Sequence, residues 1–554
     1  MKRMIPAALL AAFALHSCNT SAPLVQVQTE NVDAVPTKVA ELSEDQLKSW
    51  DFQDLVQDTI PGMSVDKAYA EIIKNKKGRT VIVGVVDSGV DINHEDLDGV
   101  LWTNEDEIPN NGIDDDKNGY IDDVHGWNFL GDVEAEQLEM SRIIQKYEPI
   151  FKGKTLDQIP AKQKEMFATY KRARKEYDED YEKYSQQLQQ YQQIVQFVEQ
   201  AHQMVSSKLG KEDYTKEELA AQQFTEPMMQ QAKNGLMQMF EYEDSIPEFL
   251  ESINEGIVDL TSRVNDNLNL DGHYRDVVGD DPDDINDTDY GNNNVVGPTP
   301  EGALHGTHVA GIIAAERNNG IGANGVANNV KIMTVRAVPD GDERDKDIAL
   351  ALRYAVDNGA KVINTSFGKY YSQNPEWVYD AIKYAAKKDV LIVNAAGNEA
   401  YDLDGGKTVY PNDQLADNIE FADNVITIGA LNDVYSGDLV APFSNYGKSN
   451  VDVFAPGMEI WSTTPENKYR FLQGTSMAAP EVAGVAAMLR GYFPQFSAKQ
   501  IKEILMQSGT TSNMTVILGG DPDTTRKFSE ISKSGKMVNM YNAFKMAELS
   551  AQNQ

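Results

Sequence analysis

Five short runs of mostly branched apolar residues constrain the fold of this chain more than any other feature. The first, VIVGVV at residues 81–86, lacks polar alternation and predicts a strand that is buried on both faces. Helical stretches separate several of the runs, and strands that alternate with such helices predict an α/β fold with a mostly parallel sheet flanked by helices. The other strands are predicted at 331–336, 361–365, 390–394 and 424–429, and helices at 66–77, 347–357, 376–388 and 541–549.

Four segments with reactive side chains stand where these strands end or where helices begin. Ligands of open α/β sheets bind at the carboxyl ends of the strands, so this placement predicts one common site. The segments are VIVGVVDSGVD at 81–91, HGTHVAGIIAA at 305–315, AAGNE at 395–399 and GTSMAAPEVAG at 474–484.

Together these segments resemble the subtilases, the family of subtilisin-like serine peptidases. The resemblance covers about residues 50–132 and 269–551, and it implies a subtilisin-like fold and peptide-bond hydrolysis through an acyl-enzyme. It also implies a triad of Asp87, His305 and Ser476, in the chain order known for subtilisin.

The residue types fit acyl transfer. Ser476 needs a base to remove its proton, which His305 supplies, and a buried Asp87 fixes the imidazole tautomer and stabilises the imidazolium. The Asn398 side-chain amide and the Ser476 backbone N–H are the expected donors to the oxyanion. His308 is expected to pack, and Glu481, where many relatives carry histidine, is expected to have little effect on the triad.

Residues Ser366, Phe367 and Gly368 follow a predicted strand. In the family, the matching segment pairs with the backbone of an extended substrate and borders the pocket for the residue before the cleaved bond. Such pairing gives affinity with little sequence selectivity. The alternative is a strand end followed by a glycine turn.

The acidic segment DDDKNGYIDD at 114–123 predicts a calcium site, because alternating oxygens can converge on a hard cation. A solvated acidic turn is the alternative. A second acidic run at 280–289 is unpatterned, and a solvated loop is favoured there. The expected calcium ligands are Asp114, Asp116, Asn118 and Tyr120, with Asp122 or Asp123 closing the shell.

The amino-terminal residues resemble an export signal. A short basic start precedes an apolar run at 4–15, too short to span a bilayer, and the run ends in Leu15-His16-Ser17-Cys18. This resembles the lipobox of bacterial lipoproteins, which implies acylation of Cys18 and a lipid-anchored protein of the cell envelope, on the periplasmic or surface face of the outer membrane. An ordinary secretory peptide is the alternative.

Composition excludes several classes of binding partner and cofactor. The formal charge of -36 makes nucleic acid a poor partner, because such a surface repels phosphates. Since Cys18 is the only cysteine, no intramolecular disulfide or cysteine-based zinc or iron–sulfur site can form. We expect polypeptide substrate, membrane contact through the lipid, calcium and no organic cofactor.

Residues 133–265 interrupt the α/β pattern. From Tyr170 to Val205, apolar and tyrosine residues recur at steps of three or four, which predicts one long helix. Thr215 with Glu218 forms a capping box before a second helix, and Pro247 starts a third. This helical insertion is a cap over the active site, a homodimer interface or a passive spacer.

The predicted organisation is therefore a signal peptide at 1–17, a tether at 18–49, and a catalytic domain at 50–132 and 266–551 interrupted by the insertion. The predicted function is serine endopeptidase. The rival is an inactive subtilase-fold scaffold whose insertion binds partners, and the intact triad motifs argue against it.

Overall fold

The computed structural model describes residues 24–29, 32–37, 41–415 and 419–553. Its centre is a nine-stranded sheet in the order β10-β13-β7-β6-β5-β4-β1-β3-β2, in which neighbouring strands are parallel except β10 and β13. All five predicted strands are confirmed. The strands are β1 Val81–Asp87, β2 Gly126–Asn128, β3 Val330–Arg336, β4 Val362–Thr365, β5 Leu391–Ala395, β6 Val425–Leu431, β7 Val453–Pro456, β10 Thr510–Thr511 and β13 Lys536–Met537.

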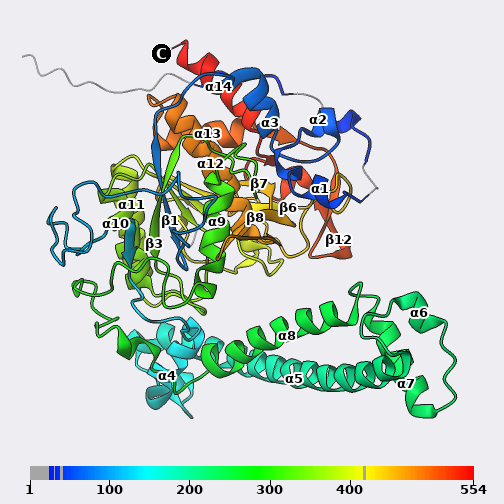
Figure 1. The fold of residues 1–554 in the computed structure, drawn as a ribbon. Helices are drawn as coiled ribbons and strands as arrows, with labels where there is room; N and C mark the ends of the chain where they lie inside the picture. Colours follow the sequence, from blue (N-terminus) through cyan, green and yellow to red (C-terminus); the bar gives the residue numbers. More distant parts are fainter. Residues whose placement is uncertain (1–23, 30–31, 38–40, 416–418, 554) are drawn as a thin grey trace, which may run out of the picture.

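Helices cover both faces of this sheet (Figure 1). On one face lie α9 (Leu304–Ala314), α12 (Thr475–Tyr492), α13 (Ala498–Ser508) and α14 (Met540–Ala551). On the other lie α10 (Asp345–Asp357) and α11 (Pro375–Lys387). Successive residues of β1 point to opposite faces, so Val85 belongs to the first core and Val86 to the second. The predicted fold class is confirmed.

The amino-terminal part packs on the body. Val32, within the predicted tether, is 2% exposed, and the Val25 N–H donates to Ser550 Oγ at 2.9 Å. The predicted helix at 66–77 is shorter in the structure, because Lys74 has a positive φ of 49°. The helices of this part are α1 Glu44–Leu47, α2 Leu55–Asp58 and α3 Val65–Ala68, which continues as a π-helix over Tyr69–Ile73.

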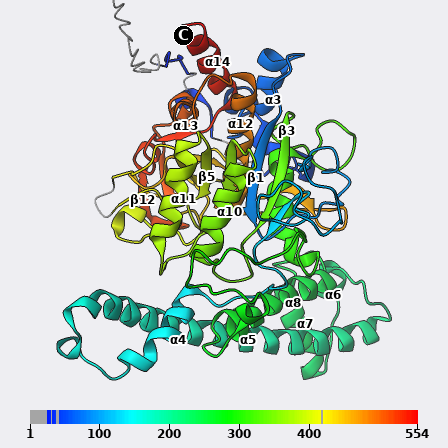
Figure 2. The same cartoon turned by 90° about the vertical axis from the view of Figure 1, so that its left-hand side faces the viewer.

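The insertion forms an elongated helical arm beside the body (Figures 1 and 2). The single long helix predicted there is confirmed as α5, and the capping box of Thr215 is present. The helices α4 and α7 were not predicted. The arm contains α4 Glu139–Phe151, α5 Lys164–Leu209, α6 Lys216–Ala220, α7 Pro227–Met239 and α8 Ile246–Ser262, followed by a π-helix over Arg263–Asn267.

The apolar stripe of α5 is covered by other helices of the same chain. Near one end, Tyr170 and Tyr177 pack in a cluster with α4, and near the other, Val198 and Val205 pack in a cluster with α7. Between these clusters the stripe is less covered, and Tyr181 is 44% exposed. Within the described residues, no helix has the length and apolar character that crossing a bilayer requires.

Two antiparallel hairpins complete the fold. The first pairs β8 (Ile460–Thr464) with β9 (Lys468–Leu472) and contacts α9. The second pairs β11 (Thr515–Leu518) with β12 (Asp521–Lys527). The first hairpin matters for the site, because it stands beside the helix that begins at the predicted catalytic histidine.

Candidate active site

The last residue of β1 and the first turn of α9 meet at the carboxyl end of the sheet. Asp87 is 1% exposed, and its Oδ1 lies 2.7 Å from His305 Nδ1. The Ser88 N–H also donates to Asp87 Oδ1 at 2.8 Å. Gly306 makes this approach possible, since an added Cβ there would lie 2.1 Å from the Gly89 carbonyl oxygen. The structure therefore brings the buried Asp87 carboxylate and the His305 imidazole together.

Opposing effects act on the protonation of His305. Burial lowers the pKa of the imidazole, but the negative charge of Asp87 and its hydrogen bond raise it more, and the net result is a raised pKa. His308, one turn along α9, is fully buried, and its Nε2 lies 3.0 Å from the Arg470 carbonyl oxygen. Burial lowers the pKa of His308 to about 3, which keeps this ring neutral. His308 is thus a packed residue, as expected.

Ser476 lies in the first turn of α12, on the same side of the sheet as α9. Its hydroxyl donates to the Ser366 carbonyl at 3.0 Å, and the Ser366 hydroxyl donates to the Ser476 carbonyl at 2.8 Å. The Ser476 hydroxyl therefore points to Ser366 in this conformation. Active sites without substrate often hold their nucleophile loosely, and the contact to the base tightens when substrate binds.

Asn398 and the start of α12 enclose a small space. Asn398 Oδ1 accepts from the Thr475 N–H at 2.8 Å and from the Thr475 hydroxyl at 2.9 Å, which orients the side-chain amide. A Cβ added to Gly474 would lie 3.5 Å from both Asn398 Nδ2 and the Ser476 backbone nitrogen. The absence of a side chain at Gly474 thus leaves room for an atom between two N–H donors.

The predicted substrate segment lies directly after β4. Ser366 and Phe367 are buried, whereas Gly368 is exposed. The segment is fixed by the next residue, because the Lys369 N–H donates to the Tyr410 carbonyl at 3.0 Å and the Tyr410 N–H donates back at 2.8 Å. Gly368 is thus exposed two residues after Ser366, whose carbonyl accepts from the Ser476 hydroxyl.

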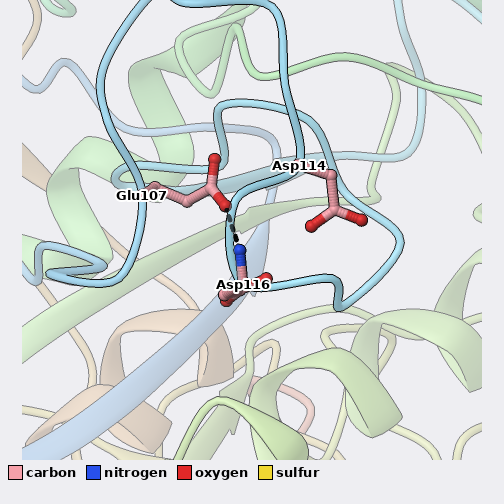
Figure 3. A group of neighbouring side chains, drawn as sticks. All are labelled: Glu107, Asp114 and Asp116. Carbon is pink, nitrogen blue, oxygen red and sulfur yellow. Dashed lines mark hydrogen bonds between the residues drawn. The ribbon is translucent and has the colours of Figure 1, made fainter.

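The acidic loop brings three carboxylates together (Figure 3). One oxygen each from Glu107, Asp114 and Asp116 lies within 4.8 Å of the others. The Glu107 carboxylate also accepts the backbone N–H groups of Asp115 and Asp116 at 2.8 and 3.1 Å. Carboxylate oxygens at this spacing fit a hard divalent cation. Glu107 lies outside the predicted motif, seven residues before Asp114, and was not predicted.

The other predicted calcium ligands have different partners. The Asp122 carboxylate accepts the N–H groups of Asn111 and Gly112 at 3.0 and 2.9 Å. Asp123 is fully buried and accepts from the side chains of Asn104, Asn118 and Tyr354. Burial raises the pKa of Asp123 to about 6.

Asn118 and Tyr120 belong to the framework of the loop. The Asn118 side-chain amide donates to Asp116 and Asp123, each at 3.0 Å, and its Oδ1 accepts the Tyr120 N–H at 2.8 Å. The Tyr120 ring packs edge-on against Trp127 and Tyr354. Of the six predicted ligands, the structure therefore brings Asp114 and Asp116 into the carboxylate cluster.

In the second acidic run Asp280 pairs with buried cationic side chains, while Asp281, Asp283, Asp284 and Asp289 are exposed. Lys346 is fully buried, and its Nζ donates to Asp280 at 2.7 Å. Arg275 forms two hydrogen bonds with Asp280, at 2.6 and 2.9 Å, and further bonds with Asp347. Asp280 thus belongs to a buried ion-pair network between this run and α10. The pattern of acidic residues alone did not reveal these partners.

Comparison with known proteins agrees with this geometry. The subtilase family model matches residues 78–528. The chain is 45% identical over 186 residues to the "Thermophilic serine proteinase" of Bacillus sp. (strain AK1), covering 33% of this chain and 42% of that protein. It is 36% identical over 223 residues to "Subtilisin Savinase" of Lederbergia lenta, covering 40% of this chain and 76% of that protein.

A solved structure described as proteases from Pseudoalteromonas arctica aligns at 29% identity and a TM-score of 0.35, covering 44% of this chain and 70% of that one. The chain spans less than half of the length of the thermophilic proteinase and more than two thirds of the savinase. Because the family model matches well over half of its residues, this chain belongs to the subtilase family.

Proposed function

We propose that this protein is a serine endopeptidase that hydrolyses peptide bonds through an acyl-enzyme on Ser476. The observation that carries the proposal is the 2.7 Å contact between Asp87 and His305 at the carboxyl end of the sheet. Ser476 lies at the same end, where it hydrogen bonds to Ser366 directly after β4. The relatives named above are described as proteases, and this chain retains each residue type of the triad.

The geometry supports a defined order of proton transfers. His305 Nε2 takes the Ser476 proton as the hydroxyl oxygen attacks the carbonyl carbon, and the imidazolium later gives that proton to the leaving amine. Asp87 holds Nδ1–H throughout and remains ionised. The oxyanion of the tetrahedral intermediate occupies the space next to Gly474, where Asn398 Nδ2 and the Ser476 N–H donate to it.

Water completes the reaction. After the amine leaves, neutral His305 removes a proton from a water molecule that attacks the acyl carbon, and Ser476 regains its proton when the intermediate collapses. The substrate chain pairs with the exposed backbone at Gly368, which places the scissile carbonyl next to Ser476.

Peptide hydrolysis by the purified protein tests the proposal. A chromogenic peptide should be cleaved by the intact protein, while Ser476→Ala should lose about 10⁶-fold in kcat, the size of the loss when a subtilisin loses its serine. Comparable hydrolysis by Ser476→Ala would refute the assignment. Absence of hydrolysis by both proteins would favour the inactive scaffold.

Calcium is proposed to bind the acidic loop through Glu107, Asp114 and Asp116. The support is their mutual spacing and their oxygen chemistry, which hard cations prefer. The ion would compensate the repulsion among three carboxylates and hold the loop before β2. Its role there is structural, and the peptide-bond chemistry belongs to the triad.

A lipid anchor at Cys18 is proposed from the sequence, since this residue lies outside the described residues. It follows an apolar run typical of export signals, and it implies an envelope location. Cys18→Ala expressed in a bacterial host should move the protein from the membrane fraction to the soluble fraction or block its processing. Unchanged membrane association at the same size would contradict lipidation.

A further inference from the structure

We propose that α8 is a crossbar in front of the active site, which restricts the substrate to extended or unfolded polypeptide. The proposal rests on the proposed peptidase function and adds a substrate class to it. It is carried by contacts that join α8 to two segments: the one after β3, which hydrogen bonds to Asp87, and the β8–β9 hairpin beside α9.

The base of the arm is fixed to the substrate segment by a buried charge network. Lys369, directly after Gly368, donates to Glu139 of α4 at 3.1 Å, and these side chains are 2% and 4% exposed. Arg142 of α4 binds Glu139 and donates to the carbonyls of Asp342 and Glu343. Removing one partner of a buried pair is strongly destabilising because it leaves an unpaired buried charge, so this end of the arm is firmly held.

On the first side of the site, the arm reaches the segment after β3. Ser262, the last residue of α8, hydrogen bonds to the Asp340 carboxylate. The Asp340 N–H donates to the Glu134 carbonyl at 2.8 Å, and the Glu136 N–H donates to the Asp340 carbonyl at 2.8 Å. This segment adjoins the triad, because the N–H groups of residues 337 and 338 donate to the Asp87 carbonyl.

On the second side, α8 reaches the β8–β9 hairpin. Glu255 Oε1 lies 3.4 Å from an Arg470 guanidinium nitrogen. The Arg470 carbonyl accepts from His308 on α9, and Arg470 lines a cavity of about 400 Å³ together with Leu304, the neighbour of His305. Glu255 therefore meets the wall of the hollow that opens beside the predicted base.

These contacts place α8 across the site. Glu255 and Ser262 are two helical turns apart, about 10 Å along the axis. Ser262 contacts the segment that hydrogen bonds to Asp87, and Glu255 contacts the hairpin that hydrogen bonds to α9, the helix of His305. In both overall views α8 lies closer to the body than α5 does (Figures 1 and 2). A helix is about 10–12 Å across with its side chains, so a helix that bridges these two segments obstructs the approach of a folded surface more than that of a single extended chain.

The crossbar is held unequally at its two ends. Both side chains of the Glu255–Arg470 pair are about half exposed, and solvent-exposed ion pairs contribute little to stability. The base is buried and the contact at Glu255 is weak. The contact between α8 and the β8–β9 hairpin can therefore open while the base of the arm at α4 stays fixed. In the closed position α8 obstructs access to the active site.

Two deletions separate the crossbar from the rest of the arm. Tyr191 on α5 lies against Gly256 on α8, and the Tyr184 ring of α5 lies under the guanidinium of Arg263, the residue after α8. The two helices therefore pair antiparallel, and one deletion can remove facing residues from both. Replacing residues 187–260 with a Gly/Ser loop removes the Glu255 contact and keeps the base. Replacing residues 200–247 removes the distal tip but keeps the contact, and it serves as the matched control.

Each protein is assayed on a short chromogenic peptide, on a disulfide-bonded folded protein with one exposed loop, and on that protein after reduction and alkylation. We expect the intact protein and the tip deletion to cleave the peptide and the unfolded chain but to cleave the folded protein poorly. The crossbar deletion should raise the folded-to-peptide rate ratio at least tenfold. An unchanged ratio, or an equal rise in the tip deletion, would overturn the proposal.

A cross-link provides a test that does not depend on a deletion that folds. Glu255→Cys and Arg470→Cys are introduced with Cys18→Ser, and the two thiols are joined by a bis-maleimide. Cross-linking should leave peptide hydrolysis unchanged and lower cleavage of the folded protein at least tenfold relative to the same protein before cross-linking. Equal cleavage before and after would overturn the proposal.

The same experiments distinguish the other readings. If the intact protein fails to cleave even the short peptide, the proposed peptidase function fails, whatever the arm does. Light scattering on the intact and deleted proteins reports the oligomeric state. A ratio that rises only as a dimer dissociates would assign the effect to an interface between two copies and would overturn the crossbar.

Discussion

His305 Nδ1 lies 2.7 Å from Asp87 Oδ1, although 218 residues separate the two in sequence. The helical arm accounts for most of that separation. It leaves the body after β2 and returns before α9, so both of its connections are near this pair. The large insertion leaves the contact between Asp87 and His305 in place, because it emerges from a loop at the carboxyl end of the sheet.

The electrostatic role of Asp87 predicts a shift of the pH profile. Neutral His305 is the active form, so kcat/KM should rise with pH through a midpoint above the usual histidine value of about 6.5. In Asp87→Asn the charge is lost and burial remains, so the pKa should fall and the midpoint should move to lower pH. We expect a loss of about 10⁴-fold in kcat as well.

The pH–rate profile measures this shift. Asp98→Asn is the control, because Asp98 is exposed on the same connecting segment. A profile for Asp87→Asn that superimposes on that of the parent would show that Asp87 does not control His305.

The space beside Gly474 predicts how substitutions around it change kcat. Asn398→Ala removes one donor and should lower kcat by about 10²–10³-fold with little change in KM. Gly474→Ala places a methyl group between both donors and should lower kcat similarly. Steady-state kinetics on a peptide separate kcat from KM. An effect of either change confined to KM would place the oxyanion elsewhere.

Calcium binding predicts a chelator response. A ligand at a hundredfold excess over its Kd stabilises the native state by about 2.7 kcal/mol. A chelator should therefore lower the melting temperature of the intact protein, and Glu107→Ala or Asp116→Ala should abolish this response. Asp106→Ala, at an exposed neighbouring carboxylate, should retain it. Melting curves that coincide with and without chelator would rule out the site.

A buried carboxyl pair predicts how stability depends on pH. Asp51 and Glu481 lie beside each other, 6% and 0% exposed, and burial raises the pKa of both groups. The native state therefore retains protons that the unfolded chain has lost, so the free energy of unfolding should fall as pH rises above about 4. Glu481→Gln should make this slope shallower. Urea unfolding at a series of pH values measures it, and an unchanged slope would contradict the pairing.

The strands, and the positions of Asp87 and His305 at a strand end and a helix start, could be predicted because their signals are local. A β-branched run such as 81–86 has few alternatives to a buried strand, and the motifs around His305 and Ser476 are contiguous. The long helix α5 was predictable because its apolar period extends over many turns.

Features that depend on distant partners were missed. Glu107 joins the acidic cluster only because the loop folds back on itself, and Lys369 is buried only because Glu139 arrives from the arm. From the sequence, Glu481 is expected only to have little effect on the triad. In the structure its carboxyl group interacts with that of Asp51 in the amino-terminal segment. The polar sequence around Val32 predicts a tether. In the structure Val32 is buried, because it packs in a cluster with residues of the carboxyl-terminal part of the chain.

In the proposed mechanism Ser476 is a nucleophile that His305 activates and the fold orients. Labelling with a fluorophosphonate, followed by mass spectrometry of the labelled peptide, tests it most directly. We predict one covalent adduct on Ser476 in the intact protein, a much slower reaction in His305→Ala, and none in Ser476→Ala. An adduct on another residue, or equal labelling of Ser476→Ala, would contradict the account.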